Sequence, residues 1–282
     1  MMDESPTPSE QHGRGARLKL QKASADGGPE LSPARPPQVR PSHAVILAGG
    51  LGTRLRPYTL DSPKPLVALD EYTILEVILR QLRASGVSRV SLSVAYLSRM
   101  IEEVVGDGRR FGLALDYYVD PYPLGTAGPL SMVRDWSEPA LVMNADVLTL
   151  LNFDELYEAH LSSGAEMTVA VHVTESSISH GIVDIAGGAV VDLWEKPRVE
   201  LDVCAGIYVI SPSAQAAVPP GVRFDMTELV RMLIADGRSV GAHRFRDDWY
   251  DIGTHTGLVR ARQSFVEKRS AYLRDAASPA SV

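Results

Sequence analysis

Glycines and cationic side chains are concentrated in one short stretch, residues 43–66. An apolar run there, typical of a buried parallel strand, ends directly in a cluster of three glycines: Gly49, Gly50 and Gly52. Such a cluster lets backbone N–H groups approach a phosphate without interference from a Cβ atom. Arg54 adds charge of the sign that a polyphosphate needs, and Lys64 lies between two prolines that restrict its backbone. The stretch therefore predicts a binding site for a nucleoside triphosphate.

Two better-known glycine motifs do not fit this stretch. A P-loop requires Gly-x-x-x-x-Gly-Lys-Ser/Thr, and no such string occurs in the sequence. The dinucleotide fingerprint fails because Leu55 stands where its third glycine belongs. What remains is Gly-Gly-x-Gly-Thr-Arg-x-x-Pro with a downstream Pro-Lys-Pro. This combination resembles the nucleotide-binding segment of the sugar-1-phosphate nucleotidyltransferases.

The resemblance implies roles for individual residues. Arg54 would bind the triphosphate and stabilise the leaving pyrophosphate, and Lys64 would bridge the α-phosphate and the acceptor phosphate. These two are the predicted catalytic residues. The predicted nucleotide-binding residues are Leu47, Ala48, Gly49, Gly50, Gly52 and Thr53, with Gly125 and Thr126 of a second glycine-rich loop. In the family, that second loop lies against the nucleotide base.

Two aspartates are predicted metal ligands. Asp146 follows an apolar strand pattern at 140–144, and hard cations such as Mg²⁺ accept carboxylate and phosphate oxygens. The family usually has Gly-Asp here, whereas this chain has alanine before the aspartate. Asp251, in the string Asp-Ile-Gly-Thr, matches the family's second metal carboxylate, while its neighbours Asp247 and Asp248 are expected to be solvated. We therefore expect Mg²⁺ as the cofactor.

A charged strand end provides the predicted acceptor site. The string Glu195-Lys196-Pro197 matches a family motif in which the glutamate accepts hydrogen bonds from sugar hydroxyls and the lysine contacts the sugar phosphate. Gly181 and Gly206, which lie in two further strings that match the family, complete the predicted acceptor-binding residues. The hairpin pattern that leads into the Glu-Lys-Pro string is predicted to form a smaller sugar-binding β subregion.

Two departures from the family fall in this acceptor region. Cys204 stands where relatives commonly have an asparagine that reaches the sugar, and thiols are poor hydrogen-bond partners. His180 stands where relatives often carry tyrosine. These departures favour an acceptor other than an ordinary hexose phosphate, such as a heptose, an amino sugar or a cyclitol phosphate of specialised metabolism, including antibiotic biosynthesis. The valienol-1-phosphate guanylyltransferases are one such group.

The rest of the sequence alternates strand and helix patterns. Helical spacing of apolar residues from Thr73 to Gly86 lies between two strand patterns, and this alternation continues along the chain. It predicts an α/β fold with a doubly wound, mainly parallel, Rossmann-like sheet, whose ligands collect at the carboxyl ends of the strands. A single helix is expected from Thr256 to about Leu273. The predicted segments are a disordered tail at 1–42, a nucleotidyltransferase domain at 43–273 and a frayed C-terminus at 274–282.

Composition limits the partners and the location. A formal net charge of −7 argues against nucleic acid and acidic membranes as partners. No apolar run is long enough to span a bilayer, and the start of the sequence has no signal-peptide pattern. The single cysteine, Cys204, suits a reducing compartment, so a cytoplasmic location is expected. The sequence does not determine the oligomeric state and is compatible with a homo-oligomer.

The resemblance implies that a sugar-1-phosphate oxygen attacks the α-phosphorus of a nucleoside triphosphate and releases pyrophosphate. The loop at 124–128 and the string at 142–146 look most similar to the mannose-1-phosphate guanylyltransferase-like branch, which favours GTP, then ATP, then dTTP or UTP. The alternative is a non-catalytic, regulatory relative that binds nucleotide sugars. It is disfavoured because four charged residues of the catalytic set are present: Arg54, Lys64, Asp146 and Asp251. A dinucleotide-dependent oxidoreductase is disfavoured by the missing third glycine.

Overall fold

The chain forms two compact units. The computed structural model describes residues 39–50, 52–59, 62–95 and 97–273. The hairpin unit consists of Thr174–Leu201, and the main unit contains the remaining described residues. The predicted tail at 1–42 falls mostly outside the described residues, and the predicted frayed end at 274–282 lies entirely outside them.

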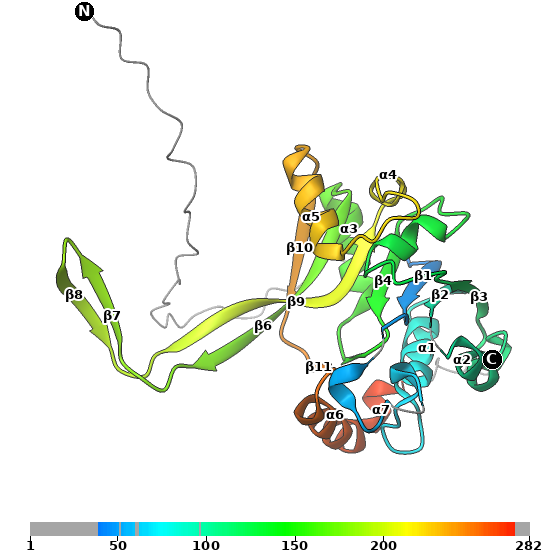
Figure 1. The fold of residues 1–282 in the computed structure, drawn as a ribbon, viewed down its shortest axis with the longest axis horizontal. Helices are drawn as coiled ribbons and strands as arrows, with labels where there is room; N and C mark the ends of the chain where they lie inside the picture. The colour runs from blue at the N-terminus through cyan, green and yellow to red at the C-terminus, as the bar shows by residue number, and fades with distance from the viewer. Residues whose placement is uncertain (1–38, 51, 60–61, 96, 274–282) are drawn as a thin grey trace, which may run out of the picture. The chain divides into compact units, whose positions relative to one another are not determined.

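The main unit is built on a seven-stranded sheet with the order β10-β6-β9-β4-β1-β2-β3 (Figure 1). In chain order its strands are β1 (His43–Leu47), β2 (Arg89–Val94), β3 (Ala114–Val119), β4 (Ala140–Asn144), β6 (Met167–Ser177), β9 (Arg198–Ile210) and β10 (Val240–Phe245). Strand β1 pairs in parallel with β2 and β4, and the pairs β2–β3 and β6–β10 are also parallel. Strand β9 runs antiparallel to β4. The predicted mainly parallel sheet is confirmed.

Helices cover both faces of this sheet because successive residues of its central strands point to opposite sides. In β1, Ala44 and Ile46 join one apolar core, and Val45 joins the other. The first core receives side chains from α1 (Ile74–Ala84), α2 (Ser98–Val105), α3 (Phe153–Ser163), α6 (His255–Glu267) and α7 (Arg269–Tyr272). The second receives them from η4 (Gly128–Met132), α4 (Pro212–Ala216) and α5 (Met226–Ala235). The doubly wound arrangement is therefore as predicted. None of the helices in the described ranges is long and apolar enough to cross a membrane.

The C-terminal helix is divided, contrary to the single helix expected. Helix α6 ends before Lys268, whose backbone leaves the helical region, and α7 follows. Lys268 Nζ lies 2.8 Å from a carboxylate oxygen of Asp248, and Tyr272 Oη donates to the same carboxylate at 3.1 Å. Burial alone would raise the pKa of Asp248, but hydrogen bonds from Lys268, Ser264 and Tyr272 lower it below its usual value. The expectation that Asp248 is solvated was wrong, because it anchors the turn between the two helices.

A second sheet of two very short strands, β5 (Val147–Thr149) and β11 (Trp249–Asp251), was not predicted. The strands are antiparallel, with Asp251 opposite Val147, and Ile252 N donates to Asp146 O at 2.9 Å. Three-residue strands have too few positions to show a period in the sequence. This ladder brings the two predicted metal ligands, separated by about a hundred residues in the chain, to the same place.

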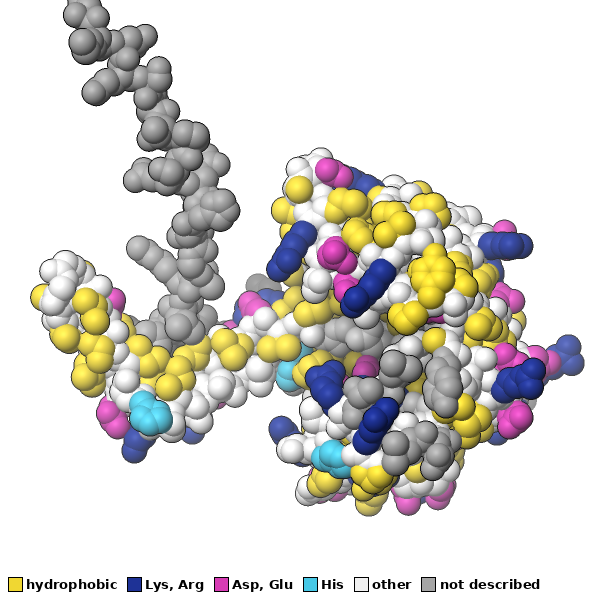
Figure 2. All heavy atoms as spheres, viewed as in Figure 1, with side chains coloured by type: hydrophobic (Ala, Val, Ile, Leu, Met, Phe, Trp, Pro, Cys, Tyr) yellow, Lys and Arg dark blue, Asp and Glu magenta, His cyan; other side chains and the backbone are white. Residues whose placement is uncertain are grey.

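The hairpin unit contains β7 (Ile182–Ala186) and β8 (Ala189–Trp194), joined at Gly187 and Gly188. Both glycines have positive φ, 59° and 82°, as a tight hairpin turn requires. The hairpin was predicted at this position. Figure 2 shows hydrophobic side chains along its length, and Ile185 and Val190 are among those that are exposed.

Candidate active site

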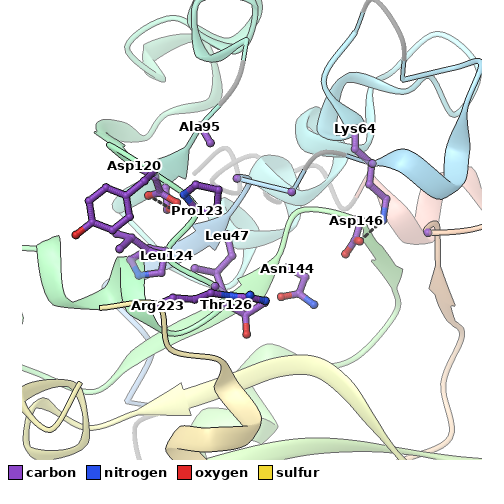
Figure 3. A pocket seen from close by; sticks show the side chains of 18 of the residues that line it. Leu47, Lys64, Ala95, Asp120, Pro123, Leu124, Thr126, Asn144, Asp146 and Arg223 are labelled. Carbon is purple, nitrogen blue, oxygen red and sulfur yellow. Dashed lines mark hydrogen bonds and ion pairs between the residues drawn. The ribbon is translucent and has the colours of Figure 1, made fainter. Parts of the chain in front are cut away.

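A pocket of about 720 Å³ opens at the carboxyl ends of the parallel strands β1, β2, β3 and β4. This volume lies within the range of small-molecule sites, and its location agrees with the rule for open α/β sheets. Figure 3 shows its side chains converging from several elements. The predicted site residues that line it are Leu47, Gly49, Gly50, Gly52, Arg54, Lys64, Gly125, Thr126 and Asp146. Most of the predicted nucleotide and catalytic residues are thus brought together.

Six other predicted site residues do not line this pocket, and the side chain of a seventh is not described. Ala48, Gly206 and Asp251 belong to the main unit but not to the pocket wall. The remaining acceptor-binding residues, Gly181, Glu195 and Lys196, belong to the hairpin unit. The side chain of Thr53 lies outside what the structure describes.

The glycine-rich loop is held by a hydrogen bond from Thr59, which was not among the predicted site residues. Thr59 is buried, and its Oγ1 donates to Gly52 O at 2.7 Å. Gly52 has φ +61°, and a Cβ atom there would lie 3.0 Å from the Thr59 side chain and 3.3 Å from Lys64 Cβ. A side chain at this position would be strained by the backbone and crowded by both neighbours. Glycine is therefore required for the loop to lie against the segment that carries Lys64.

Lys64 projects into the pocket from a short turn, η2 (Lys64–Leu66), set between Pro63 and Pro65. The lysine is buried, with 9% of its surface exposed, and its ammonium group pairs with the Asp146 carboxylate (Figure 3). Asp146 lies between β4 and β5, so both strands fix its backbone. The main unit thus holds a cation and an anion together beside the glycine-rich loop.

Asp251 approaches the same pair from β11. A Cβ atom built on Gly253 would lie 2.7 Å from Asp251 Oδ1 and 3.2 Å from Lys64 Nζ, so the two charged groups flank this glycine closely. Gly253 N also donates to Asp251 Oδ1 at 2.7 Å. In the part of the chain that is described, no cluster of three or more His, Cys, Asp or Glu side chains has the arrangement of a metal site. Two carboxylates still suit Mg²⁺, which is typically bound through one or two carboxylates plus substrate phosphates and water.

The second glycine-rich loop is attached to the start of α5. Thr126 N donates to Asp225 Oδ1 at 3.0 Å, and Ala127 N and Gly128 N both donate to Phe224 O at 2.9 Å. In return, Met226 N donates to Thr126 Oγ1 at 2.8 Å. Asp225 is the N-cap of α5 and forms a capping box with Glu228. The hydrogen bond to Thr126 is an additional role, because it fixes the loop predicted to lie against the base.

We expect Asp225→Ala to weaken nucleotide binding as well as the fold. Loss of the cap should lower the free energy of unfolding by about 1 kcal/mol. Loss of the loop contact should raise the KM for the nucleotide by about tenfold, because hydrogen bonds to charged groups contribute about 1.5–3 kcal/mol. Denaturant unfolding and steady-state kinetics measure the two effects. The control is Asn152→Ala, which removes the α3 cap and its bond to Asp154 N, and which should lower stability without changing KM. Equal KM values for both variants would contradict the role of Asp225.

Gly206 lies against the side chain of Asn144, a residue of the pocket wall. It has φ +69°, and a Cβ atom there would lie 2.6 Å from the amide nitrogen of Asn144, which lines the pocket. Gly206→Ala should therefore lower the free energy of unfolding by about 1–3 kcal/mol more than Gly237→Ala, the added cost of overpacking. Gly237 is the matched control because it has φ +72° and nothing within 4 Å of a built Cβ, so it shares only the backbone strain. If denaturant unfolding gave equal losses of unfolding free energy for the two variants, the Asn144 side chain would move aside without cost.

Three predicted acceptor residues lie together within the hairpin unit. A Cβ atom on Gly181 would lie 3.3 Å from Glu195 Oε2, and Lys196 Nζ is 3.9 Å from Glu195 Oε1. The glutamate and lysine side chains are about two-thirds exposed, at 70% and 68%. Both are therefore accessible to a ligand.

The two residues that depart from the family have partners of their own. His180 Nδ1 lies 2.9 Å from Ser179 Oγ in the hairpin unit. In the main unit, Cys204 Sγ lies 3.2 Å from Tyr208 Oη. Burial raises the pKa of Tyr208, with the Cys204 thiol adding to the shift. The thiol therefore contacts a neutral phenol.

Comparison with known proteins identifies the fold and the family. A model of the nucleotidyl transferase family matches residues 43–268 of the chain. The chain belongs to this family. The resemblance to sugar-1-phosphate nucleotidyltransferases, inferred from the glycine-rich and Pro-Lys-Pro strings, is thereby confirmed.

Named relatives of this nucleotidyltransferase are enzymes. The mannose-1-phosphate guanylyltransferase catalytic subunit beta of Danio rerio is 34% identical over 247 residues, covering 82% of this chain and 68% of the relative. The subunit of the same name from Drosophila melanogaster is 37% identical over 183 residues, covering 61% of this chain and 49% of the relative.

The crystal structure of HddC from Yersinia pseudotuberculosis matches with a TM-score of 0.64 at 24% identity, covering 79% of this chain and 99% of that one. A UDP-glucose pyrophosphorylase structure matches with a TM-score of 0.59 at 17% identity, covering 81% and 100%. These two structures confirm the fold.

The nucleotidyltransferase pocket also contains residues that were not named individually from the sequence, although Leu124 belongs to the loop predicted to lie against the base. They are Ser93, Ala95, Asp120, Tyr122, Pro123, Leu124, Pro129, Asn144, Arg223 and Gly253. Several follow strand ends, which is the available signal, but an isolated polar residue after a strand is common in turns. Arg223 had no signal at all, because it precedes a helix almost a hundred residues after the loop that it faces.

Proposed function

We propose that this nucleotidyltransferase joins GTP to a sugar- or cyclitol-1-phosphate and releases pyrophosphate. The observation that carries the proposal is the Lys64–Asp146 pair beside the glycine-rich loop, inside a pocket large enough for a nucleotide. GTP is favoured because the relatives from Danio rerio and Drosophila melanogaster are named mannose-1-phosphate guanylyltransferases. The reaction forms a bond from an acceptor phosphate oxygen to the α-phosphorus and breaks the bond from that phosphorus to the bridging oxygen of pyrophosphate.

The roles follow from charge and position. The acceptor phosphate is already anionic, so no general base is needed, and catalysis consists of positioning and charge neutralisation. Lys64 would hold the α-phosphate and acceptor phosphate together, since its ammonium group lies in the pocket. Arg54, which is exposed on the same wall, would neutralise the departing pyrophosphate. For Lys196, contact with the acceptor phosphate is proposed on the resemblance of the Glu-Lys-Pro string alone.

Mg²⁺ is the proposed cofactor. Asp146 and Asp251 would hold it, because β5 and β11 bring both residues to the Lys64 ammonium group. When bound, the ion would neutralise phosphate charge and polarise the α-phosphoryl group. Lys64 occupies one side of the Asp146 carboxylate, so the lysine and the aspartates would form a mixed-charge cradle for the triphosphate.

For the acceptor we propose a cyclitol, heptose or amino-sugar phosphate, with valienol 1-phosphate as one candidate. The support is chemical. A thiol at position 204 and an imidazole at position 180 replace hydrogen-bonding groups that relatives use for hexoses. Both are exposed, so each is free to contact a ligand that differs from a hexose in its ring substituents.

Pyrophosphate release tests the proposal. Purified protein with Mg²⁺ is incubated with each of four nucleoside triphosphates, crossed against mannose, glucose, heptose, amino-sugar and cyclitol 1-phosphates. Release that requires GTP and one acceptor is the expected result. Nucleotide-dependent thermal stabilisation without release for any pair would instead support the binding-only, regulatory alternative.

A further inference from the structure

Gln81 is a buried amide on an otherwise apolar helix face. Only 6% of its surface is exposed. The other buried side chains of α1 are all aliphatic, namely Ile74, Leu75, Val77, Ile78, Leu79 and Leu82. A buried amide costs free energy unless it is hydrogen-bonded, so packing alone would favour a leucine or a methionine at this position. The proposed mechanism gives Gln81 no task.

The amide nitrogen of Gln81 holds the short strand that follows Asp146. Its Nε2 donates to Thr149 O, the carbonyl oxygen of the last residue of β5, at 2.8 Å. Strand β5 belongs to a two-stranded sheet, so the edge that does not face β11 depends on groups outside the sheet for its hydrogen bonds. Gln81 supplies one of them from a helix that is packed into the main core.

Thr149 in turn joins the two strands that carry the predicted metal ligands. Its Oγ1 donates to Asp248 O at 2.9 Å, and its backbone is paired with Trp249 in the ladder. Thr149 lies three residues after Asp146, and Trp249 lies two residues before Asp251. Mg²⁺ demands near-ideal octahedral geometry, so a displacement of this ladder would disturb both carboxylates as ligands.

Gln81 also lines a small cavity beside α1. The oxygen of its amide, Oε1, is buried and accepts no hydrogen bond from the described residues. The cavity has a volume of about 10 Å³, enough for one water molecule and for nothing larger. A water there would donate to Oε1 and to Ser85 Oγ, whose own hydrogen is directed to Gln81 O at 3.2 Å. The amide would then be fixed through its oxygen as well as through its nitrogen.

We propose that Gln81 is a positioning residue for the metal site, which holds the β5–β11 ladder so that Asp146 and Asp251 stay in place for Mg²⁺. This inference rests on the proposed function of the two aspartates. A two-stranded sheet is marginally stable by itself, so it needs a rigid support such as a helix of the core. Removal of residues that orient metal ligands lowers metal affinity or activity by roughly 10–100-fold.

The test is Gln81→Met, which keeps the approximate size of the side chain but cannot donate to Thr149 O. The Mg²⁺ concentration for half-maximal rate should rise by about tenfold, at the lower end of that range because Gln81 acts through the backbone. The KM for GTP at saturating Mg²⁺ should stay near the wild-type value. A second readout needs no turnover. With the non-reactive α,β-methylene analogue of GTP bound, the increase in melting temperature caused by Mg²⁺ should also require about tenfold more of the ion.

Trp136→Phe is the matched control, because Trp136 Nε1 also donates from a buried side chain to a strand carbonyl, Ile210 O, at 3.3 Å. Ile210 is paired with Ala140 at the amino end of β4, and neither Trp136 nor Ile210 lines the pocket. The control should lower the melting temperature without changing the Mg²⁺ requirement. If Gln81→Met does not fold, Thr149→Val, which removes the hydroxyl bonded to Asp248 O, is measured in the same way and should raise the requirement too.

Two outcomes would contradict the proposal at different levels. A folded Gln81→Met protein with a lower melting temperature and a wild-type Mg²⁺ requirement in both readouts would show that the amide only stabilises the fold, which overturns the positioning role alone. A wild type whose rate and melting temperature do not respond to Mg²⁺ would overturn the proposed metal site itself.

Discussion

Replacing Lys64 with alanine is expected to lower kcat by at least ~10²-fold, the scale of losing one preorganised electrostatic contact. The lysine is buried, and its ammonium group lies between the Asp146 carboxylate and the Asp251 turn, where a transferring phosphoryl group would need positive charge. Lys64→Arg should not restore the rate, because a planar, forked guanidinium cannot replace a compact ammonium group in this space. Single-turnover kinetics with saturating substrates measures the loss directly.

The control for Lys64 is a second lysine–aspartate pair away from the pocket. Lys268→Ala breaks the pair with Asp248 and should lower stability while leaving kcat near the wild-type value. Melting temperatures of both variants separate folding from catalysis. A folded Lys64→Ala enzyme with kcat within a factor of about three of the wild type would show that the ammonium group does not act on the reacting phosphates.

Asp146→Asn is expected to produce the second large effect. The variant keeps its shape but removes the charge, so it should lower kcat by at least ~10²-fold and raise the Mg²⁺ concentration needed for half-maximal rate by at least about tenfold. The lysine beside it should also lose its orientation, since its partner would no longer be charged. Rates measured over a Mg²⁺ titration report both changes.

An exposed aspartate provides the comparison for Asp146. Asp135 is 84% exposed, lies outside the pocket and makes only a 3.8 Å contact with Arg89. Asp135→Asn should therefore leave both kcat and the Mg²⁺ dependence unchanged. If Asp146→Asn showed an unchanged Mg²⁺ requirement, the carboxylate would not be a ligand of the ion, whatever the loss in rate.

The glycine-rich loop and the mainly parallel character of the sheet could be predicted because both depend on local patterns. A cluster of glycines after an apolar strand constrains the backbone within ten residues, and the capping box of α1 between Thr73 and Glu76 is also local. The same holds for the hairpin turn at Gly187 and Gly188. Each of these signals is complete within one short stretch of sequence.

The parts that escaped prediction depend on contacts between distant segments. The three-residue strands β5 and β11 form a sheet by pairing with each other, about a hundred residues apart in the chain. Asp248 looked solvated because its partners Ser264, Lys268 and Tyr272 come from a later helix pair. Asp120 was not predicted as a pocket residue, since a single carboxylate after a strand belongs to no recognisable motif. Its surroundings are formed by Ser93 and Gly49 of neighbouring segments.

The central claim is that an acceptor phosphate attacks the α-phosphorus of GTP, and the fate of labelled phosphates tests it most directly. The enzyme is incubated with Mg²⁺, its acceptor and GTP labelled with ³²P at either the α- or the γ-position. The account predicts that the α-label appears in the sugar nucleotide and the γ-label in pyrophosphate. Transfer of the γ-label to the acceptor, or release of the γ-label as inorganic phosphate in the absence of phosphatase, would contradict it.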